Sequence, residues 1–401
     1  MTDFNIVVIG GGAAGLCAAI SAKKAARNSS VCILERMPKI GKKILVTGNG
    51  RCNFSHLPVE PNRYTGSFKA DKILSQYPDL REFFLDLGVA SAADDEGRLY
   101  PLSNTAASIH EGLSLKLKQL GIEVRTDFAV ESVLVKNGAF VIKSPKEALT
   151  AQRVILAAGG KSSPAHGSDG SGFALAKQLG VEHTALSPAL CPLPADKSVM
   201  KPLEGVRVRC GAGLYHKGKL LKEQKGEVQF TKTALSGICI FNLSLYTEQG
   251  CDYTVRLDLL PDYSEKQAAA LIEKAVKSRK GLAPDVQISG IFHWKTAAAL
   301  LKSAFPKPPK TLTEKDALAL ARGAKAWDFD VTAPVDFAAA QVTKGGVHGS
   351  QVDDCLQVKS IKGLYLAGEI LDVAGECGGY NLHFAWASGL AAGKAAGESL
   401  C

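Results

Sequence analysis

A glycine-rich turn between an apolar run and an alanine-rich run is the feature that most constrains this sequence. Residues 5–9 (Asn-Ile-Val-Val-Ile) are, after the first, apolar and β-branched, as a buried parallel strand requires. Gly10, Gly12 and Gly15 follow with the spacing G-x-G-x-x-G, and residues 16–27 contain neither Pro nor Gly. The sequence therefore predicts a strand, a tight turn and a helix in direct succession.

Each of these glycines has a physical reason to be there. Gly10 allows a tight turn, Gly12 lets the backbone approach a pyrophosphate, and Gly15 lets the helix pack close to the strand. The phosphates would then bind unpaired N–H groups at the positive end of the helix. A second apolar run, Val31–Leu34, ends in Glu35, 20 positions after Gly15, where an acceptor for a ribose hydroxyl is expected. The three glycines by themselves are also compatible with a tight turn that binds no ligand. The full order of strand, glycines, helix, second strand and terminal acid indicates a dinucleotide site.

Composition limits the class of protein. A chain of 401 residues is expected to form two or three domains, and 46% hydrophobic with 22% charged residues is typical of soluble globular proteins. No run of about 18 uncharged apolar residues occurs, and no signal-peptide pattern follows the first residue, so we expect a cytoplasmic protein without a membrane span. The ten cysteines lack Cys-x-x-Cys and zinc-ligand spacing, so we expect reduced thiols and no metal.

The net charge of +9 comes from 48 basic and 39 acidic residues. It suits anionic ligands or weak contact with nucleic acid, but an ordinary basic surface is the better explanation. The lysines are dispersed along the chain and lack the interleaved aromatic residues of a single-strand platform, which argues against a nucleic-acid partner. The oligomeric state is not indicated.

Two further segments carry glycines beside charged residues. Residues 37–53 contain adjacent lysines and Arg51, so this loop suits the phosphates and polar edge of a dinucleotide, or is a lysine-flanked surface loop. Residues 363–369 repeat the pattern of an apolar strand that runs into a glycine and an acid. A glycine-rich loop, 375–381, then leads into a last helix of small residues, 382–397.

The middle of the chain differs in pattern from both ends. Beyond about residue 186 prolines cluster and strand-like alternation appears, and residues 264–323 then look largely helical. The sequence therefore predicts one dinucleotide-binding domain made from both chain ends and interrupted between about 190 and 340.

Taken together, these segments resemble the NAD(P)/FAD-dependent oxidoreductases, the FAD-binding flavoproteins that include aminoacetone-oxidase-type enzymes. The resemblance runs essentially end to end, and its most specific pieces are 41–53, 231–237, 342–347, 363–372 and 378–381. It implies an α/β fold: a Rossmann-like FAD-binding domain built from both chain ends, an inserted β-barrel-like domain and a small helical cap. The implied boundaries are 1–189 and 341–401 for the FAD domain, 190–262 and 324–340 for the β-rich insert, and 263–323 for the cap.

The resemblance also implies which residues bind FAD. Those expected at the pyrophosphate and the adenosine are Gly10, Gly12, Ala13, Ala14, Gly15, Glu35, Arg36 and the backbone of Val130. Those expected along the phosphates and the flavin are Lys43, Thr47, Gly48, Gly50, Arg51, Cys52, Asn53, Ala158 and Gly159. Gly368 and Glu369 stand where similar flavoproteins often place Gly-Asp against the ribityl chain, and Glu is one methylene longer. Gly379, Tyr380 and Asn381 would lie against the flavin ring.

No acid–base residue stands out for catalysis. Reduction places negative charge near N1 and C2=O of a flavin, and the N–H groups of residues 379–381 would suit it. His348 and His383 are the nearest histidines in sequence, and each is either a proton donor or a satisfied or exposed side chain. Cys52 is either a nucleophile or a packing residue.

These observations favour an FAD-dependent oxidoreductase that transfers a hydride between bound FAD and a small organic substrate. A second strand–glycine–helix–strand cassette is missing, so NAD(P)H would act only as a transient donor in the substrate cleft. A flavin-dependent RNA-modifying enzyme and a non-catalytic flavin-binding protein are the alternatives.

Overall fold

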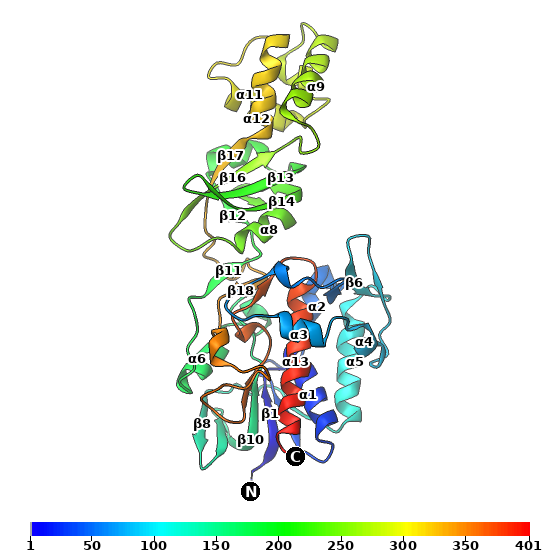
Figure 1. Cartoon of the computed structure of the whole chain (residues 1–401), viewed down its shortest axis with the longest axis vertical. Coiled ribbons are helices and arrows are strands. Elements are labelled where there is room, and N and C mark those ends of the chain that lie inside the picture. The colour runs from blue at the N-terminus through cyan, green and yellow to red at the C-terminus, as the bar shows by residue number, and fades with distance from the viewer. Residues whose placement is uncertain (1) are drawn as a thin grey trace. The chain divides into compact units, whose positions relative to one another are not determined.

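The computed structural model describes residues 2–401, which divide into two compact units (Figure 1). The first unit comprises the chain up to Pro188 together with Asp336–Cys401, and the second comprises Ala189–Val335. The first unit thus contains both ends of the chain, as the repeated strand-into-glycine pattern predicts. No helix among the described residues is long and apolar enough to cross a membrane.

The first unit is organised around a mixed sheet in which the strand order is β7-β2-β1-β10-β9-β8, with β19 also paired to β10. Strands β7, β2, β1, β10 and β19 are parallel to their neighbours in this group, whereas β8 and β9 form an antiparallel extension. The carboxyl ends of the parallel strands therefore meet at one edge, where ligands of such sheets bind. The strands are β1 (Phe4–Ile9), β2 (Val31–Leu34), β7 (Glu123–Arg125), β8 (Ser132–Lys136), β9 (Ala139–Lys143), β10 (Ala148–Leu156) and β19 (Leu364–Leu366).

Helices α1 (Ala13–Ala25) and α13 (Tyr380–Glu398) pack against each other along their lengths and hold the two chain ends together (Figure 1). Glycines of α13 make the close approach possible. A Cβ atom at Gly389 would collide with the carbonyl oxygen of Ala14, and one at Gly393 with that of Ala18. The small residues that the sequence places in both helices are therefore required by this contact.

Shorter elements complete the first unit. Its other helices are α2 (Lys42–Val46), α3 (Asp71–Gln76), α4 (Arg81–Leu85), α5 (Ala106–Gln119) and α6 (Ser171–Gln178), with the short 3-10 segments η1 (Thr47–Gly50), η2 (Pro61–Arg63), η3 (Pro164–His166), η6 (Gly349–Gln351) and η7 (Gly368–Ile370). Its other strands are β3 (Ser55–His56), β4 (Tyr64–Thr65), β5 (Ser91–Ala93), β6 (Arg98–Pro101), β18 (Val342–Lys344) and β20 (Ala374–Gly375), and β11 (Ser187–Ala189) lies at the boundary of the units.

The second unit contains an antiparallel sheet in the order β12-β15-β14-β13-β16-β17. No closed barrel is found among residues 2–401, because a single bridge, from Ala195 to Val331, joins the two ends of this path. Pro192 and Pro194 lack the N–H groups that would extend β12 into a full ladder. The strands are β12 (Leu193–Pro194), β13 (Arg207–His216), β14 (Lys219–Phe230), β15 (Ala234–Ser236), β16 (Asp252–Asp258) and β17 (Trp327–Thr332).

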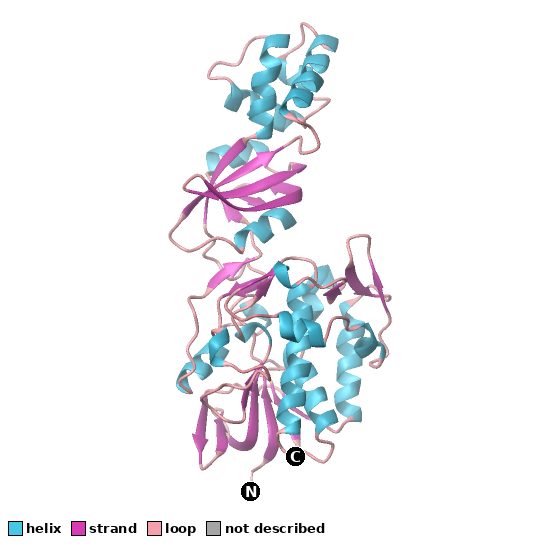
Figure 2. Cartoon of the chain, viewed as in Figure 1, coloured by secondary structure: helices cyan, strands magenta, loops and turns pink. Residues whose placement is uncertain are grey.

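The second unit also contains helices (Figure 2), of which α9, α10, α11 and α12 lie in sequence between β16 and β17. Buried residues such as Ile272, Leu300 and Leu320 place these helices in one hydrophobic core with the sheet. The helices are α7 (Lys197–Met200), α8 (Ile238–Ser244), α9 (Glu265–Ser278), α10 (Pro284–Ile288), α11 (Trp294–Ala304) and α12 (Ala317–Lys325), with the 3-10 segments η4 (Lys201–Leu203) and η5 (Glu314–Asp316).

Candidate functional site

The turn after β1 has the geometry that its glycine spacing predicts. Gly10 has φ +108°, and a Cβ atom there would collide with the carbonyl oxygen of Ala157 at the end of β10. A Cβ atom at Gly15 would collide with the carbonyl of Gly10, so α1 can leave the strand this closely only with glycine. A Cβ atom at Gly12, in contrast, would have no heavy atom within 4 Å, so the backbone here borders open space.

The N-terminus of α1 is suited to an anion. Gly12 is its N-cap, no side chain caps it, and its first turn contains no acidic residue. The first N–H groups of a helix have no intrahelical partner, and the helix dipole adds positive potential at the same place. These N–H groups, including those of Ala13 and Ala14, together with the open space at Gly12, fit a pyrophosphate.

Glu35 at the end of β2 is held by the neighbouring backbone. Its Oε2 atom accepts a hydrogen bond from the N–H of Gly11, and its Oε1 atom accepts one from Met37, each at 2.8 Å. A carboxylate oxygen can accept a second hydrogen bond, so Glu35 retains acceptor capacity for a ribose hydroxyl. The carbonyl of Glu35 accepts from Phe128 N–H at 2.9 Å, which brings the segment leading to half-buried Val130 alongside.

The loop 167–170 also lies beside this region, which the sequence reasoning missed. Arg36 forms an ion pair with Asp169, and a Cβ atom at Gly167 would lie 2.9 Å from the Met37 side chain. The spacing of glycines in 167–172 differs from that of a dinucleotide turn, so a sequence search for that turn passes over it.

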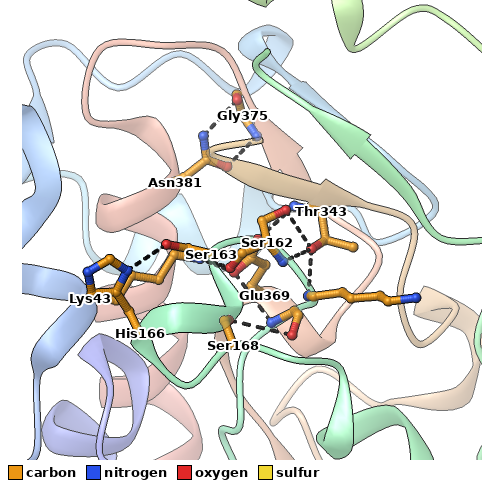
Figure 3. Close-up of polar contacts among 11 residues, drawn as sticks. Lys43, Ser162, Ser163, His166, Ser168, Thr343, Glu369, Gly375 and Asn381 are labelled. Atoms are coloured by element: carbon orange, nitrogen blue, oxygen red, sulfur yellow. Dashed lines mark hydrogen bonds and ion pairs between the residues drawn. The ribbon is translucent and has the colours of Figure 1, made fainter. Parts of the chain in front are cut away.

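Glu369 joins four chain segments through its carboxylate (Figure 3). Its Oε2 atom lies 3.0 Å from Lys43 Nζ and accepts from Gly160 N–H at 3.4 Å, while its Oε1 atom accepts from Thr343 N–H at 2.7 Å. Lys43 also donates to the carbonyl of Ser162 at 3.3 Å. The longer Glu side chain therefore binds protein donors, and the positive charge of Lys43 is paired within the protein.

Thr343 extends this network, and the sequence reasoning did not single it out as a site residue. Its Oγ1 atom accepts from the N–H groups of Lys161 at 2.7 Å and Ser162 at 3.1 Å (Figure 3). Ala158 and Gly159 precede these residues, and Gly159 has φ +74°. The loop after β10 is therefore hydrogen-bonded to both Glu369 and Thr343.

The predicted loop 47–53 is shaped by left-handed residues. Gly48, Asn49, Gly50 and Cys52 have φ between 55° and 81°. Cys52 is fully buried, and burial raises the pKa of its thiol to about 11, which fits the packing interpretation better than a nucleophile. In the same loop Thr47 Oγ1 donates to the Ile44 carbonyl at 2.7 Å, and the Arg51 guanidinium lies 4.8 Å from the centre of the Tyr100 ring.

The start of α13 meets this loop. Gly379 has φ +97°, and a Cβ atom there would collide with the Ser55 carbonyl. With the Asn53 amide oxygen facing α13, that oxygen accepts from Gly379 N–H at 3.2 Å. The Asn381 side chain accepts from Gly375 N–H at 2.8 Å and donates to the Gly375 carbonyl at 2.7 Å (Figure 3). Because Gly379 N–H already donates to Asn53, the N–H groups of Tyr380 and Asn381 are the donors that the first turn of α13 offers to a ligand.

Gly368 brings the two ends of the chain into contact. A Cβ atom at Gly368 would lie 2.8 Å from the Cβ atom of Ala14, and its N–H donates to Ser388 Oγ of α13 at 2.9 Å. The turn at 10–15 and the segment 363–381 are therefore in contact within the first unit.

The two candidate histidines differ in environment. His383 is fully buried, with Nδ1 2.7 Å from Ser55 Oγ and Nε2 2.9 Å from the Tyr77 carbonyl. Burial lowers its pKa to about 4, so the ring is neutral near pH 7, as expected for the satisfied alternative. His348 is exposed, and its Nδ1 atom caps η6 by accepting from Ser350 N–H at 3.2 Å.

Tyr380 lies in an aromatic cluster that the sequence reasoning also missed. Its ring stacks on His56 at 4.7 Å, and its carbonyl accepts from Tyr64 Oη at 2.8 Å. The Tyr380 hydroxyl is buried without a partner among the described residues, and burial raises its pKa to about 12. Tyr64 lines a neighbouring cavity of about 630 Å³ formed by residues between Val59 and Asp71, none of which was predicted.

A parallel sheet with a glycine turn, an acid-ended second strand and a donor-rich loop at its carboxyl edge defines a Rossmann-type dinucleotide-binding flavoprotein. The family model described as "HI0933-like protein Rossmann domain" matches residues 4–395, and the chain belongs to this HI0933-like family. It is an FAD-dependent oxidoreductase.

Named relatives cover nearly the whole chain. The chain is 37% identical to a 3-dehydro-bile acid delta(4,6)-reductase of Clostridium scindens, over 98% of this chain and 99% of that protein. It is 27% identical to a ribosomal RNA dihydrouridine synthase of Escherichia coli, over 97% and 96% of the two chains. The solved 3-ketosteroid delta1-dehydrogenase of Sterolibacterium denitrificans matches 99% of both chains with 14% identity and a TM-score of 0.54, which shows a shared fold.

Proposed function

We propose that this oxidoreductase reduces a carbon–carbon double bond conjugated to a carbonyl group in a small organic molecule. The observation that carries the proposal is the 37% identity to a relative named as a 3-dehydro-bile acid delta(4,6)-reductase. A 3-oxo steroid with double bonds at positions 4 and 6 is a conjugated dienone. The product named for the second relative, dihydrouridine, also arises by saturation of a double bond conjugated to a carbonyl.

The chain offers a consistent set of groups to hold FAD, which supplies the hydride when it is bound. In the proposal, the N–H groups at the start of α1 bind the pyrophosphate and Glu35 accepts from the adenosine ribose. The segment at Val130 borders the adenine, and the ion pair between Arg36 and Asp169 lies at the adenosine end of the site. Residues 47–53 and 158–160 border the flavin, and the open space at Gly12 supports this placement.

In the proposal, the first turn of α13 stabilises the negative charge that develops on the flavin during reduction. The N–H groups of Tyr380 and Asn381 would stabilise the negative charge at the N1–C2=O edge of the flavin. His348 is the proposed proton donor, because both ring nitrogens of His383 are bonded to protein atoms whereas only Nδ1 of His348 has a partner among the described residues.

The finer features expected from the sequence belong to the same proposal. They are the β-rich insert of 190–262 with 324–340, the helical cap of 263–323, NAD(P)H as a transient electron donor and a cytoplasmic location. The order of strands and helices in the second unit supports the insert and the cap. An aminoacetone-oxidase-type reaction is the competing specificity.

The proposal is tested by reducing the FAD-loaded protein anaerobically and mixing it with substrates. A 3-oxo-4,6-diene bile acid should reoxidise the flavin rapidly and gain the mass of H2. The matched substrate with a 3-hydroxyl group, whose double bonds are not activated by a carbonyl, should not. If neither compound reoxidises the reduced flavin, and aminoacetone reduces the flavin of the oxidised protein in a separate measurement, the proposal is wrong and the amine-oxidising alternative is supported.

A second candidate substrate is a uridine within RNA. It is favoured by the E. coli relative and by the basic character of the second unit, described below. In the same experiment, an RNA hairpin with unpaired uridines would take the place of the bile acid, and dihydrouridine in the product would support this candidate.

A further inference from the structure

The excess positive charge of the chain is concentrated in the second unit. Residues 189–335 contain 22 Lys and Arg against 15 Asp and Glu, a net charge of +7. The first unit contains 26 Lys and Arg against 24 Asp and Glu, a net charge of +2. The whole-chain count hides this division, because it becomes apparent only when the boundary between the units is known.

Within the second unit, a long segment lacks acidic residues altogether. No Asp or Glu occurs between Asp285 and Glu314, whereas this interval contains the four lysines Lys295, Lys302, Lys307 and Lys310. The last three are exposed, and none of the four pairs with a carboxylate of the described residues. Lys295 is held in place by its hydrogen bond to the Glu204 carbonyl at 2.8 Å. Their positive charge is therefore available to an external anion.

Helix α11, which is labelled in Figure 1, begins at an aromatic residue that is next to Lys295 in the sequence. Trp294 is 61% exposed, and Lys295 Nζ lies 5.7 Å from the centre of its ring. Trp294 and Lys302 are both exposed, while Leu300 and Leu301 are buried in the core. We define the α11 surface as Trp294, Lys295, Lys302, Lys307 and Lys310.

We propose that the α11 surface docks a folded RNA. The lysines would contact phosphates, and an unpaired base would stack on Trp294, the combination by which proteins bind single-stranded segments. A membrane surface fits less well, because an interfacial helix needs an exposed apolar face and that of α11 is already buried in the core. This inference does not depend on which conjugated double bond is reduced at the flavin.

The test measures binding without turnover, so that its failure is distinct from failure of the proposed reduction. The oxidised full-length protein is titrated into a fluorescently labelled RNA hairpin of about 20 nucleotides with an unpaired loop. The variant K295Q/K302Q/K307Q/K310Q should bind at least about tenfold more weakly, and its affinity should depend less on salt because phosphate contacts are lost. Trp294→Ala should weaken binding about fivefold or more, and Trp294→Phe much less, because stacking is retained.

The matched control removes the same charge from the first unit. Lys118, Lys136, Lys143 and Lys146 are exposed and have no carboxylate partner among the described residues, so K118Q/K136Q/K143Q/K146Q should bind RNA as the wild type does. Unchanged flavin absorbance and unfolding midpoints check that all variants fold.

Three results would overturn the inference. The first is equal loss of affinity in the two quadruple variants, which would mean general attraction by net charge. The second is binding to heparin as tight as to the hairpin, with Trp294→Ala unaffected. The third is binding to phosphatidylserine vesicles without binding to the hairpin.

Discussion

Lys43 and Glu369 are 326 residues apart in sequence, yet Lys43 Nζ lies 3.0 Å from Glu369 Oε2. The pair connects α2 to η7, the segment that follows β19, and both side chains are mostly buried. Glu369 also accepts from the N–H groups of Gly160 and Thr343, so one carboxylate joins four segments that border the proposed flavin site.

Removing either partner should destabilise the first unit. Lys43→Met leaves Glu369 without its cation, and Glu369→Gln leaves Lys43 without its anion, so each should cost about 1–3 kcal/mol of unfolding free energy. The double variant K43M/E369Q should cost less than the sum of the two, with a coupling of about 1 kcal/mol. Urea unfolding and FAD titration measure both effects. Lys42→Met, at the adjacent half-buried lysine, is the control, and strict additivity of the two substitutions would contradict a direct interaction.

The features that could be predicted from sequence are those encoded by local spacing. Gly10 and Gly15 require close backbone approach, and the structure shows that approach at both positions. The strand that ends at Gly368 repeats the pattern of the strand that ends at Gly10, so the sequence indicated that both chain ends share one sheet. Family membership and the FAD-dependent activity follow from the same segments.

The features that could not be predicted depend on contacts between distant segments. Thr343, Ser162 and Asp169 have ordinary residue types and no regular spacing to the glycine turn. The sequence therefore did not mark them as site residues, although Thr343 lies in the segment 342–347 that carries part of the resemblance. The role of Glu369 required knowledge of its partners, because the residue type alone suggested a cofactor contact. The barrel-like closure likewise depends on pairing between β12 and β17, which prolines restrict to one bridge.

Glycine at position 393 should be required for the packing of α1 on α13. A methyl group at Gly393 would meet the backbone carbonyl of Ala18, which has little room to move. Gly393→Ala should therefore lower the free energy of unfolding by about 1–3 kcal/mol despite the higher helix propensity of alanine. Lys394→Ala, at the exposed neighbour, should change it by less than about 0.5 kcal/mol. Fluorescence of Trp386 reports on this unit when Trp294 and Trp327 are replaced by phenylalanine, and a stabilised Gly393→Ala variant would contradict the packing argument.

Glu35 should discriminate FAD from a flavin that lacks adenosine. Glu35→Gln weakens the acceptor proposed for the adenosine ribose, so the Kd for FAD should rise about tenfold or more. The Kd for FMN, which has no adenosine, should change by less than about twofold. Flavin fluorescence quenching measures both constants. Glu123→Gln, which removes an exposed carboxylate of β7, is the control. An equal loss of affinity for FAD and FMN would show that Glu35 does not contact the adenosine ribose.

His383 should make the stability of the first unit depend on pH. Its folded-state pKa is lowered to about 4, below the ordinary value of 6.5, because the ring is buried. The unfolded state therefore binds more protons than the folded state between these two values, and stability falls as the pH falls through that window. The contribution is present in full above pH 6.5 and is lost by about pH 4, a change of roughly 3 kcal/mol. Urea midpoints of the wild type and His383→Gln, followed by Trp386 fluorescence, should differ in their pH dependence over this range. His348→Gln, at an exposed ring, should retain the wild-type slope, and identical slopes for wild type and His383→Gln would show that His383 is not the group that titrates.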